Sequence, residues 1–260
     1  MVLARYRSGS NLLCNGINGN KKIKVMGEIF NISDMAEAPE KYLDRNFIRD
    51  YFRIPIFARH RALGFKFMYG QITGAEFDPK HWGPNIKYNG RILASIGSVS
   101  QWLEENDCSS DCFDGLLDQM RDDSDIRIIH LTRVNQLDSY VSFQLALRQD
   151  LWIKQKYVSM NKFDVDREDL DAWFSRGKEY EAYYQSLFSG HRLLEIKYED
   201  LVANYADTMC SVLGFLDQDQ AAVERPSLSK QNAKKIQDIV SNYDELKLHF
   251  TSTEWERYFH

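Results

Sequence analysis

A short loop after the first apolar run of the chain has the residue types of an anion-binding site. It reads Arg7-Ser8-Gly9-Ser10-Asn11, and a helical pattern follows. Gly9 allows a tight turn that brings backbone N–H groups close to an oxyanion, and a helix N-terminus favours negative charge. Ser10 and Asn11 add polar donors, and Arg7 adds a planar cation. The alternative is a structural turn in which a serine caps the helix.

The loop lacks the parts of a Walker A motif. That motif needs a longer glycine-rich loop that ends in Lys-Ser/Thr, which cradles phosphates and holds Mg²⁺. Here the loop is shorter, its lysine is missing, and no later strand ends in an obvious acidic metal ligand. These differences count against an ATP-dependent kinase of the P-loop type, which stays an alternative.

A second candidate anion site lies near the middle of the chain. Arg133 ends a strand pattern, and Ser142 stands nine residues later in the helical pattern that follows. An arginine at a strand end and a serine in the next helix can converge on one phosphate. Ser139 is an alternative partner for Arg133. Two separate sites would suit a ligand that is phosphorylated at two places, although each residue taken singly is also typical of a protein surface.

Short strand patterns alternate with helical patterns along the chain. Runs rich in β-forming residues predict strands at Val2–Tyr6, Ile23–Met26, Gly64–Tyr69, Ile126–Thr132 and Leu193–Tyr198. Apolar residues at helical spacing predict helices at Pro39–Phe52, Gln136–Trp152, Glu168–Phe188, Tyr205–Leu216 and Lys230–Ser241. Strands separated by helices predict an α/β fold with three α/β/α layers around a mainly parallel sheet. Ligands of such sheets bind at the carboxyl ends of the strands, where both candidate sites lie.

The composition is that of an acidic globular chain. Its 260 residues carry 33 Lys+Arg and 38 Asp+Glu, a net charge of −5, which argues against a nucleic-acid partner. With 43% hydrophobic residues and no repeat or linker, a single domain over residues 1–260 is the simplest interpretation. No apolar run reaches the ~18 residues of a membrane span. The four cysteines form neither a disulfide scaffold nor a metal-ligand pattern. From the apolar runs and the cysteines together we expect a cytoplasmic protein with no transmembrane segment and no metal.

Three motifs, in order, resemble those of the sulfotransferase superfamily. Residues 7–13, Arg-Ser-Gly-Ser-Asn-Leu-Leu, resemble its 5′-phosphosulfate loop, and Arg133 with Ser142 is similar to its 3′-phosphate motif. Residues 195–201, Glu-Ile-Lys-Tyr-Glu-Asp-Leu, match its Tyr-Glu-Asp-Leu segment. Two departures stand out: Arg7 occupies the place of a common lysine, and the spacing from arginine to serine is nine residues rather than the usual eight.

Further stretches resemble bacterial carbohydrate sulfotransferases of the nodulation-factor and trehalose types. They are residues 27–30, 64–68 and 242–246, so the resemblance spans essentially the whole chain. It implies a P-loop-like sulfotransferase fold. The implied donor is 3′-phosphoadenosine 5′-phosphosulfate (PAPS), with PAP as product and no metal. The implied reaction is in-line transfer of a sulfuryl group to an acceptor hydroxyl, which we expect to belong to a carbohydrate or glycolipid.

The resemblance also implies roles for particular residues. The donor site would consist of Arg7, Ser8, Gly9, Ser10, Asn11, Leu12, Arg133, Ser142, Tyr198 and Lys230. The loop would hold the 5′-phosphosulfate, and Arg133 with Ser142 would hold the 3′-phosphate. Tyr198 would lie against the adenine, although a tyrosine at a strand end is also typical of a core. Lys230 would cover the nucleotide or, alternatively, be a solvated lysine.

Glu28 is the candidate catalytic base, and it matches the acid proposed as base in the trehalose-type enzymes. It follows the second predicted strand, where an apolar, aromatic neighbourhood would raise the pKa of its carboxyl group. The alternative is that Glu28 caps the following turn. His60, His81 and His130 are rival bases, each more typical of a structural histidine.

Lys66 is the remaining catalytic candidate, beside Glu28 and Arg7. It lies in a strongly apolar strand, where an unpaired ammonium group would be costly. It would contact the sulfate or the acceptor, or else be a lysine on an edge strand whose ammonium reaches solvent. Residues 77–110, which include His81 and Trp102, read equally well as an acceptor cleft or as a packed insertion. A non-catalytic nucleotide-binding protein is the third functional alternative.

Overall fold

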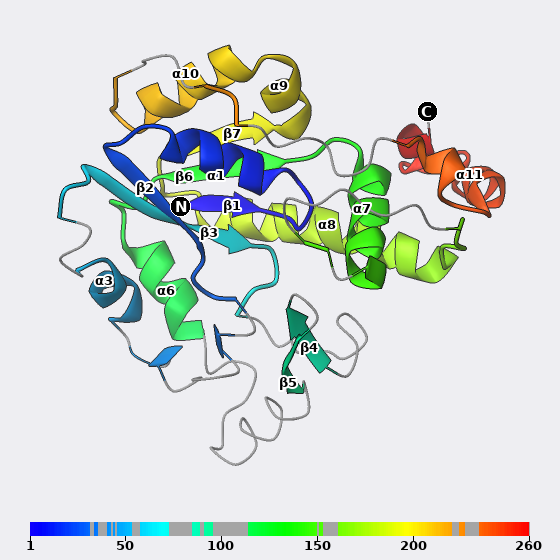
Figure 1. Cartoon of the computed structure of the whole chain (residues 1–260), viewed down its shortest axis with the longest axis horizontal. Coiled ribbons are helices and arrows are strands. Elements are labelled where there is room, and N and C mark those ends of the chain that lie inside the picture. The colour runs from blue at the N-terminus through cyan, green and yellow to red at the C-terminus, as the bar shows by residue number, and fades with distance from the viewer. Residues whose placement is uncertain are drawn as a thin grey trace.

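The central sheet has five parallel strands. The structure is a computed structural model and describes residues 1–31, 34–35, 41–42, 44, 46–53, 58–72, 85–88, 91–95, 114–149, 151–152, 161–219, 224–226 and 234–259. The strands are β1 (Val2–Ala4), β2 (Ile23–Glu28), β3 (Ala62–Met68), β6 (Ile128–Thr132) and β7 (Leu193–Lys197). They lie in the order β2-β3-β1-β6-β7 with every neighbouring pair parallel (Figure 1). All five predicted strands are confirmed, with small shifts at their ends.

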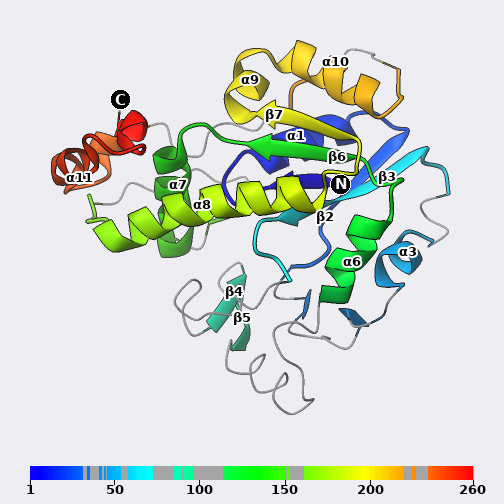
Figure 2. The same cartoon turned by 180° about the vertical axis from the view of Figure 1, so that it is seen from behind.

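Helices cover both faces of the sheet. One face carries α1 (Ser10–Asn18), α9 (Tyr198–Ala203) and α10 (Tyr205–Phe215). The other carries α3 (Phe47–Phe52), α6 (Asp114–Asp122) and α8 (Arg167–Leu187), the last of which lies across the sheet in Figure 2. The division follows from the alternation of side chains along a strand. In β3, Phe65 and Phe67 pack on the α6 and α8 side, and Met68 packs on the α1 side. The three-layer α/β/α prediction is confirmed.

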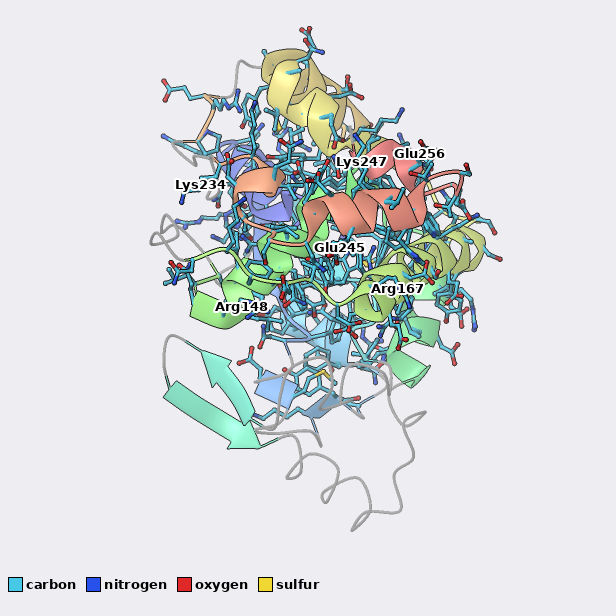
Figure 3. The ribbon with its side chains drawn as sticks, turned by 90° about the vertical axis from the view of Figure 1, so that its right-hand side faces the viewer. Arg148, Arg167, Lys234, Glu245, Lys247 and Glu256 are labelled. Carbon is cyan, nitrogen blue, oxygen red and sulfur yellow. The ribbon has the colours of Figure 1, made fainter. Side chains whose placement is uncertain are left out.

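A third apolar cluster lies beside the sheet. Here α7 (Gln136–Gln149), α11 (Tyr243–Phe250) and the 3-10 turn Glu256–Phe259 pack against α8. Exposed charged side chains such as Arg148, Arg167 and Lys247 cover the outside of this cluster (Figure 3). The packing fixes α7 against α8, and so fixes the loop through which β6 enters α7.

Two predicted helices differ from the structure. In the range Lys230–Ser241, the described part from residue 234 onwards forms only a 3-10 turn at Ile236–Asp238. The helix is wrong there because Lys235 is extended, and Val240 instead pairs with Phe163 in an isolated parallel bridge. In the range Pro39–Phe52, the α-helix begins at Phe47. Residues 39, 40, 43, 45 and 230–233 lie outside the described part.

The segment that the sequence left open, residues 77–110, is described only as an antiparallel pair of strands. These are β4 (Asn85–Tyr88) and β5 (Arg91–Ser95). His81 and Trp102 lie outside the described residues, so the choice between acceptor cleft and packed insertion stays open. In the part of the chain that the structure describes, no helix is long and apolar enough to cross a bilayer.

The strand order brings two loops together at one end of the sheet. β1 lies between β3 and β6, with Ala4 in register with Leu131 of β6. The chain leaves β1 toward β2 on one side, whereas β6 and β7 extend the sheet on the other. Ligands of parallel sheets bind at such a reversal of strand order. The predicted anion loop after β1 and Arg133 after β6 therefore lie next to each other.

Candidate functional site

The loop between β1 and α1 has a conformation that depends on Gly9. Its φ of 90° is unfavourable for a residue with a side chain. A Cβ atom at this position would also lie 2.3 Å from Cδ2 of Tyr198, so both the backbone and the space exclude a larger residue. Gly9 is the residue before α1, and no side chain caps the helix with a hydrogen bond. The alternative of a capping serine is therefore wrong. The first N–H groups of a helix have no intrahelical partners, which makes a helix N-terminus a site that favours an anion.

The other members of the loop lie close around this helix end. Ser10 and Leu12 are buried in the first turn of α1, where Leu12 packs into the core. Arg7 has a φ of 64°, an uncommon conformation for a residue other than glycine. Its guanidinium group donates from Nε to Ser142 Oγ at 3.0 Å and from Nη1 to the carbonyl of Trp152 at 2.9 Å. These bonds to α7 and beyond hold the strained loop in place.

Arg133 is buried and is held from three directions. Its Nη1 donates to the carbonyl of Arg7 at 2.9 Å, and its Nη2 pairs with Asp138 at 2.9 Å. Its Cζ lies 4.7 Å from the centre of the Tyr198 ring, whose edge lies against Gly9. The two predicted anion sites are thus joined by a direct hydrogen bond. Tyr198 is the first residue of α9, and its ring contacts both sites.

Both candidate serines of α7 bond the loop after β1, and their proposed contact with a phosphate stays a prediction. Ser142 Oγ accepts its hydrogen bond from Arg7, and Ser139 Oγ donates to the carbonyl of Tyr6 at 3.1 Å. Each serine therefore connects α7 to the loop after β1, and neither bonds Arg133. Lys230 lies outside the described residues.

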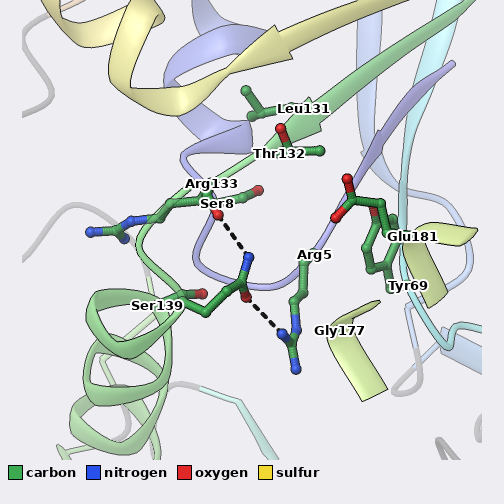
Figure 4. A pocket seen from close by; sticks show the side chains of 10 residues that line it. Arg5, Ser8, Tyr69, Leu131, Thr132, Arg133, Ser139, Gly177 and Glu181 are labelled. Carbon is green, nitrogen blue, oxygen red and sulfur yellow. Dashed lines mark hydrogen bonds between the residues drawn. The ribbon is translucent and has the colours of Figure 1, made fainter. Parts of the chain in front are cut away.

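Two buried donors at this junction have no hydrogen-bond partner among the described residues. They are Ser8 Oγ and Arg133 Nε. Ser8 and Arg133 also line a small pocket at the ends of β1 and β6 (Figure 4). It is lined by Arg5, Ser8, Tyr69, Leu131, Thr132, Arg133, Gln136, Ser139, Gly177 and Glu181. A buried donor without a partner costs free energy unless a ligand or water satisfies it, so the donor set fits an anion.

Lys66 links the anion loop to Glu28. Its Nζ pairs with Glu28 Oε1 at 2.8 Å and donates to Asn11 Oδ1 at 2.8 Å. The pair depends on a local irregularity of the β-bulge kind, because β2 and β3 change register between Val25 and Glu28. Bulges re-aim side chains in this way beside functional sites. The side chain of Lys66 is only 8% exposed and lies on an internal strand, so the alternative of a solvent-reaching lysine on an edge strand is wrong.

Glu28 has polar neighbours rather than the apolar ones expected from the sequence. Besides Lys66, its carboxylate accepts hydrogen bonds from Gln71 Nε2 at 3.1 Å and from Asn31 Nδ2 at 3.5 Å. One cation and two amide donors therefore hold the carboxylate in place. The contact with Asn31 is the part of the turn-capping alternative that the structure retains.

The rival histidine bases differ in their positions. His60 precedes β3 and so lies at the amino edge of the sheet, opposite the anion loop. His130 is fully buried within β6, where its Nε2 contacts the hydroxyl of Tyr69. Burial lowers the pKa of His130 below its usual 6.5, with Glu195 opposing the shift. His81 lies outside the described residues.

We expect His130 to make the protein less stable in acid. In the unfolded chain this histidine binds a proton near pH 6.5, whereas in the folded protein burial keeps the imidazole neutral at that pH. The free energy of unfolding therefore falls as the pH drops below that value. Replacing His130 by glutamine should shrink the difference in Tm between about pH 7.5 and about pH 5.5, measured by thermal denaturation. The same change at His249, an exposed histidine, is the matched control. An unchanged difference in His130→Gln would contradict the assignment.

Sequence reasoning missed three residues of the site. Gln71 is fully buried and fixes Glu28, and its own Oε1 accepts from the backbone N–H of Met68 at 2.9 Å. Arg5 and Gln136 line the pocket. Their positions in the sequence could have indicated them. Arg5 and Gln71 are polar residues just after a strand, and Gln136 is the first residue of the helix that follows β6. The described residues contain no group of three or more His, Cys, Asp or Glu side chains placed to bind a metal.

Several known proteins are similar to this chain. Nodulation protein H of Rhizobium meliloti strain 1021 is 26% identical over 138 residues, which make up 52% of this chain and 56% of that protein. Nodulation protein H of Rhizobium tropici is 24% identical over 156 residues, 56% of this chain and 59% of that protein. The chain thus spans somewhat more than half the length of these curated relatives. A crystal structure of a sulfotransferase from Alicyclobacillus acidocaldarius aligns with 96% of this chain and 90% of its own, at 13% identity and a TM-score of 0.47.

The family comparison is decisive. Residues 88–245 match the model of the Stf0 sulphotransferase family, and this range includes Arg133, Ser142 and Tyr198. The match covers more than half of the chain and confirms the resemblance to bacterial sulfotransferases that the motifs predict. The chain belongs to the Stf0 sulphotransferase family.

Proposed function

We propose that this protein transfers a sulfuryl group from PAPS to a hydroxyl group of a carbohydrate or glycolipid. The observation that carries the proposal is the pair of buried donors, Ser8 Oγ and Arg133 Nε, which lack partners among the described residues where β1 and β6 end side by side. Membership of the Stf0 family supports the reaction class. The name of the nodulation proteins offers no acceptor, so the carbohydrate acceptor rests on the resemblance of the motifs.

The proposed donor site uses both loops. The N-terminus of α1, with Ser8, Gly9, Ser10 and Asn11, would hold the 5′-phosphosulfate, while Arg7 supplies a nearby positive charge. Arg133 would hold the 3′-phosphate through its unpartnered Nε. PAPS supplies the activated sulfuryl group, and negative charge grows on the departing phosphate as the bond breaks. Cations and helix N–H groups fixed beside that phosphate lower the barrier, because they need not reorganise during the reaction.

Three further residues complete the proposed donor site. Ser142 would help Arg133 to hold the 3′-phosphate, and its hydrogen bond from Arg7 would connect it to the loop that holds the 5′-phosphosulfate. Tyr198 would border the adenosine, because its ring lies between Gly9 and Arg133. Lys230, outside the described residues, remains a proposed cover for the nucleotide.

The proposed acceptor side centres on Glu28 and Lys66. Glu28 would accept the proton of the attacking hydroxyl, and the ammonium of Lys66 would stabilise the group in transfer. Lys66 Nζ bonds both Asn11 of the donor loop and Glu28 at 2.8 Å, so it lies between the two halves of the reaction. Such positioning and electrostatics carry most of the catalysis in phosphoryl transfer, and we expect the same for sulfuryl transfer.

Ligand-induced stabilisation tests the donor. PAP at about 100 times its Kd should raise the free energy of unfolding by about 2.7 kcal/mol, which raises Tm by about 5–10 °C for a chain of this size. The shift should persist in EDTA and exceed that of AMP and of ATP with Mg²⁺. A response to ATP with Mg²⁺ alone would instead favour the kinase alternative.

Transfer of radiolabelled sulfate from PAPS onto a panel of oligosaccharides and glycolipids tests the reaction itself. Binding of PAP without transfer to any acceptor would favour the non-catalytic alternative.

We also propose a cytoplasmic location, in which PAPS is made available as a donor. It is supported by Cys14 and Cys210, which are free thiols as in a reducing compartment.

A further inference from the structure

A chain of buried hydrogen bonds connects α8 to the main chain of Arg133. Arg5 Nη2 donates to the carbonyl of Trp173 at 2.5 Å, and its Nη1 donates to Gln136 Oε1 at 2.7 Å. Gln136 Nε2 in turn donates to the carbonyl of Arg133 at 2.7 Å. Figure 4 shows the last two bonds crossing the pocket from Arg5 to Arg133. The chain joins the ends of β1 and β6 to the long helix behind them.

Arg5 is buried at a cost that core packing alone would not require. It is 8% exposed, and no carboxylate among the described residues forms an ion pair with it. Its guanidinium lies 3.8 Å from the centre of the Trp173 ring. Desolvation lowers its pKa from 12.5 to about 9, with Tyr69 opposing the shift and Arg176 adding to it. An apolar side chain would fill the same space without this penalty.

The approach of α8 leaves room for this arrangement at one point. A Cβ atom at Gly177 would lie 2.1 Å from Arg5 Nη1. The absence of a side chain at Gly177 therefore sets the position of the guanidinium, and through Gln136 it affects the loop after β6.

One donor of the Arg133 side chain has no partner among the described residues. Its two Nη atoms are engaged by Arg7 and Asp138, and the buried Nε is the donor without a described partner. The direction of Nε depends on the main chain at Arg133, whose carbonyl is fixed by Gln136. The next two N–H groups, of Val134 and Asn135, are held by the carboxylate of Glu199. The loop is thus pinned on both sides of Arg133.

We propose that Arg5 and Gln136 are positioning residues that aim Arg133 at the 3′-phosphate, and so set the preference of the donor site for nucleotides that carry this group. The proposal rests on the proposed function. It assigns the discrimination between PAP and AMP, which differ only in the 3′-phosphate, to a hydrogen-bonded chain that does not touch the nucleotide. Loss of these hydrogen bonds should weaken PAP binding and leave AMP binding nearly unchanged.

Two variants interrupt the hydrogen bonds between Arg5, Gln136 and Arg133 by different means. Gln136→Glu keeps an acceptor for Arg5 but removes the N–H that holds the carbonyl of Arg133, so the fold keeps its buried charge satisfied. Gly177→Ala removes no polar group and favours the helix, yet it displaces the guanidinium of Arg5. Gln218→Glu is the matched control for the first variant, because Gln218 Nε2 also bonds a backbone carbonyl, that of Leu216, far from the site. Gly115→Ala is the control for the second, since no described residue lies within 4 Å of a Cβ there.

The readout is the ratio of the Kd values for AMP and PAP, measured by isothermal titration calorimetry. We expect the ratio to fall about tenfold or more in both variants, the effect of one misplaced charge-assisted hydrogen bond, and to stay at the wild-type value in both controls. An unchanged ratio in Gln136→Glu and Gly177→Ala, or an equal loss of both affinities, would overturn the proposal. A wild-type protein with no preference for PAP would instead overturn the proposed donor.

Discussion

Replacing Glu28 by glutamine should reduce sulfuryl transfer by about 10²- to 10⁴-fold while the affinity for PAP stays close to that of the wild type. The amide oxygen of glutamine can still accept a hydrogen bond from Lys66, so the connection to Asn11 of the donor loop survives. An amide cannot accept the proton of the attacking hydroxyl, however. The rate of transfer from radiolabelled PAPS and the Kd of PAP, measured on the same preparation, separate the two effects.

A second acid–lysine pair provides a matched control for this experiment. Glu254 bonds Lys178 Nζ at 2.8 Å on the surface, and Glu254→Gln should change neither the rate nor the affinity. Glu28→Asp keeps the carboxylate but withdraws it by one methylene, and its rate should lie between those of the wild type and Glu28→Gln. Full turnover in Glu28→Gln would exclude Glu28 as the base. Loss of PAP binding in that variant would assign it a role in the donor site instead.

Replacing Gly9 by alanine should weaken PAP binding by about tenfold or more and lower Tm. A residue with a side chain held at this positive φ costs about 1–3 kcal/mol, and its Cβ would lie 2.3 Å from the ring of Tyr198. Moving that ring would also disturb Arg133, whose guanidinium lies against it. The chain can relieve the overlap only by moving the helix end that we propose to hold the phosphosulfate. Calorimetric titration with PAP and a thermal melt of the free protein measure the two effects.

A double variant separates the overlap from the backbone strain. Combining Gly9→Ala with Tyr198→Ala removes the ring, so the combined loss of stability should be smaller than the sum of the single losses. The difference in stability between Tyr198→Ala and the double variant reports the backbone strain of alanine at φ 90°. Strict additivity of the two changes would show that the contact between Gly9 and Tyr198 has no energetic consequence. Gly115→Ala, whose Cβ would meet no described residue within 4 Å, should be close to neutral.

Much of the fold was predictable because its signals are local. Runs of β-forming residues and helical periodicity identified all five strands of the sheet and most of the helices on its faces. The helix prediction was wrong where a longer-range contact competed with the local pattern, as at Val240, which pairs with Phe163. The single domain over residues 1–260 stays a prediction.

The candidate site was predictable in part for the same reason. The loop at residues 7–11 and Arg133 each follow a strand of a parallel sheet, and the carboxyl ends of such strands meet at one edge. The sequence also indicated which family the chain belongs to. It could not indicate that Ser142 bonds Arg7, because that contact between distant residues depends on how α7 packs.

The residue types of the site, their order and the end of the sheet at which they lie were determined by the amino-acid sequence, since these follow from short-range patterns. Only the tertiary structure decided which side chains meet. A one-residue shift of register between β2 and β3 pairs Glu28 with Lys66. Without that shift the carboxylate would turn away, because each one-residue shift reverses the face of a strand. The contact of Arg5 with Gln136 spans 131 residues of sequence, and no local pattern encodes a contact at that separation.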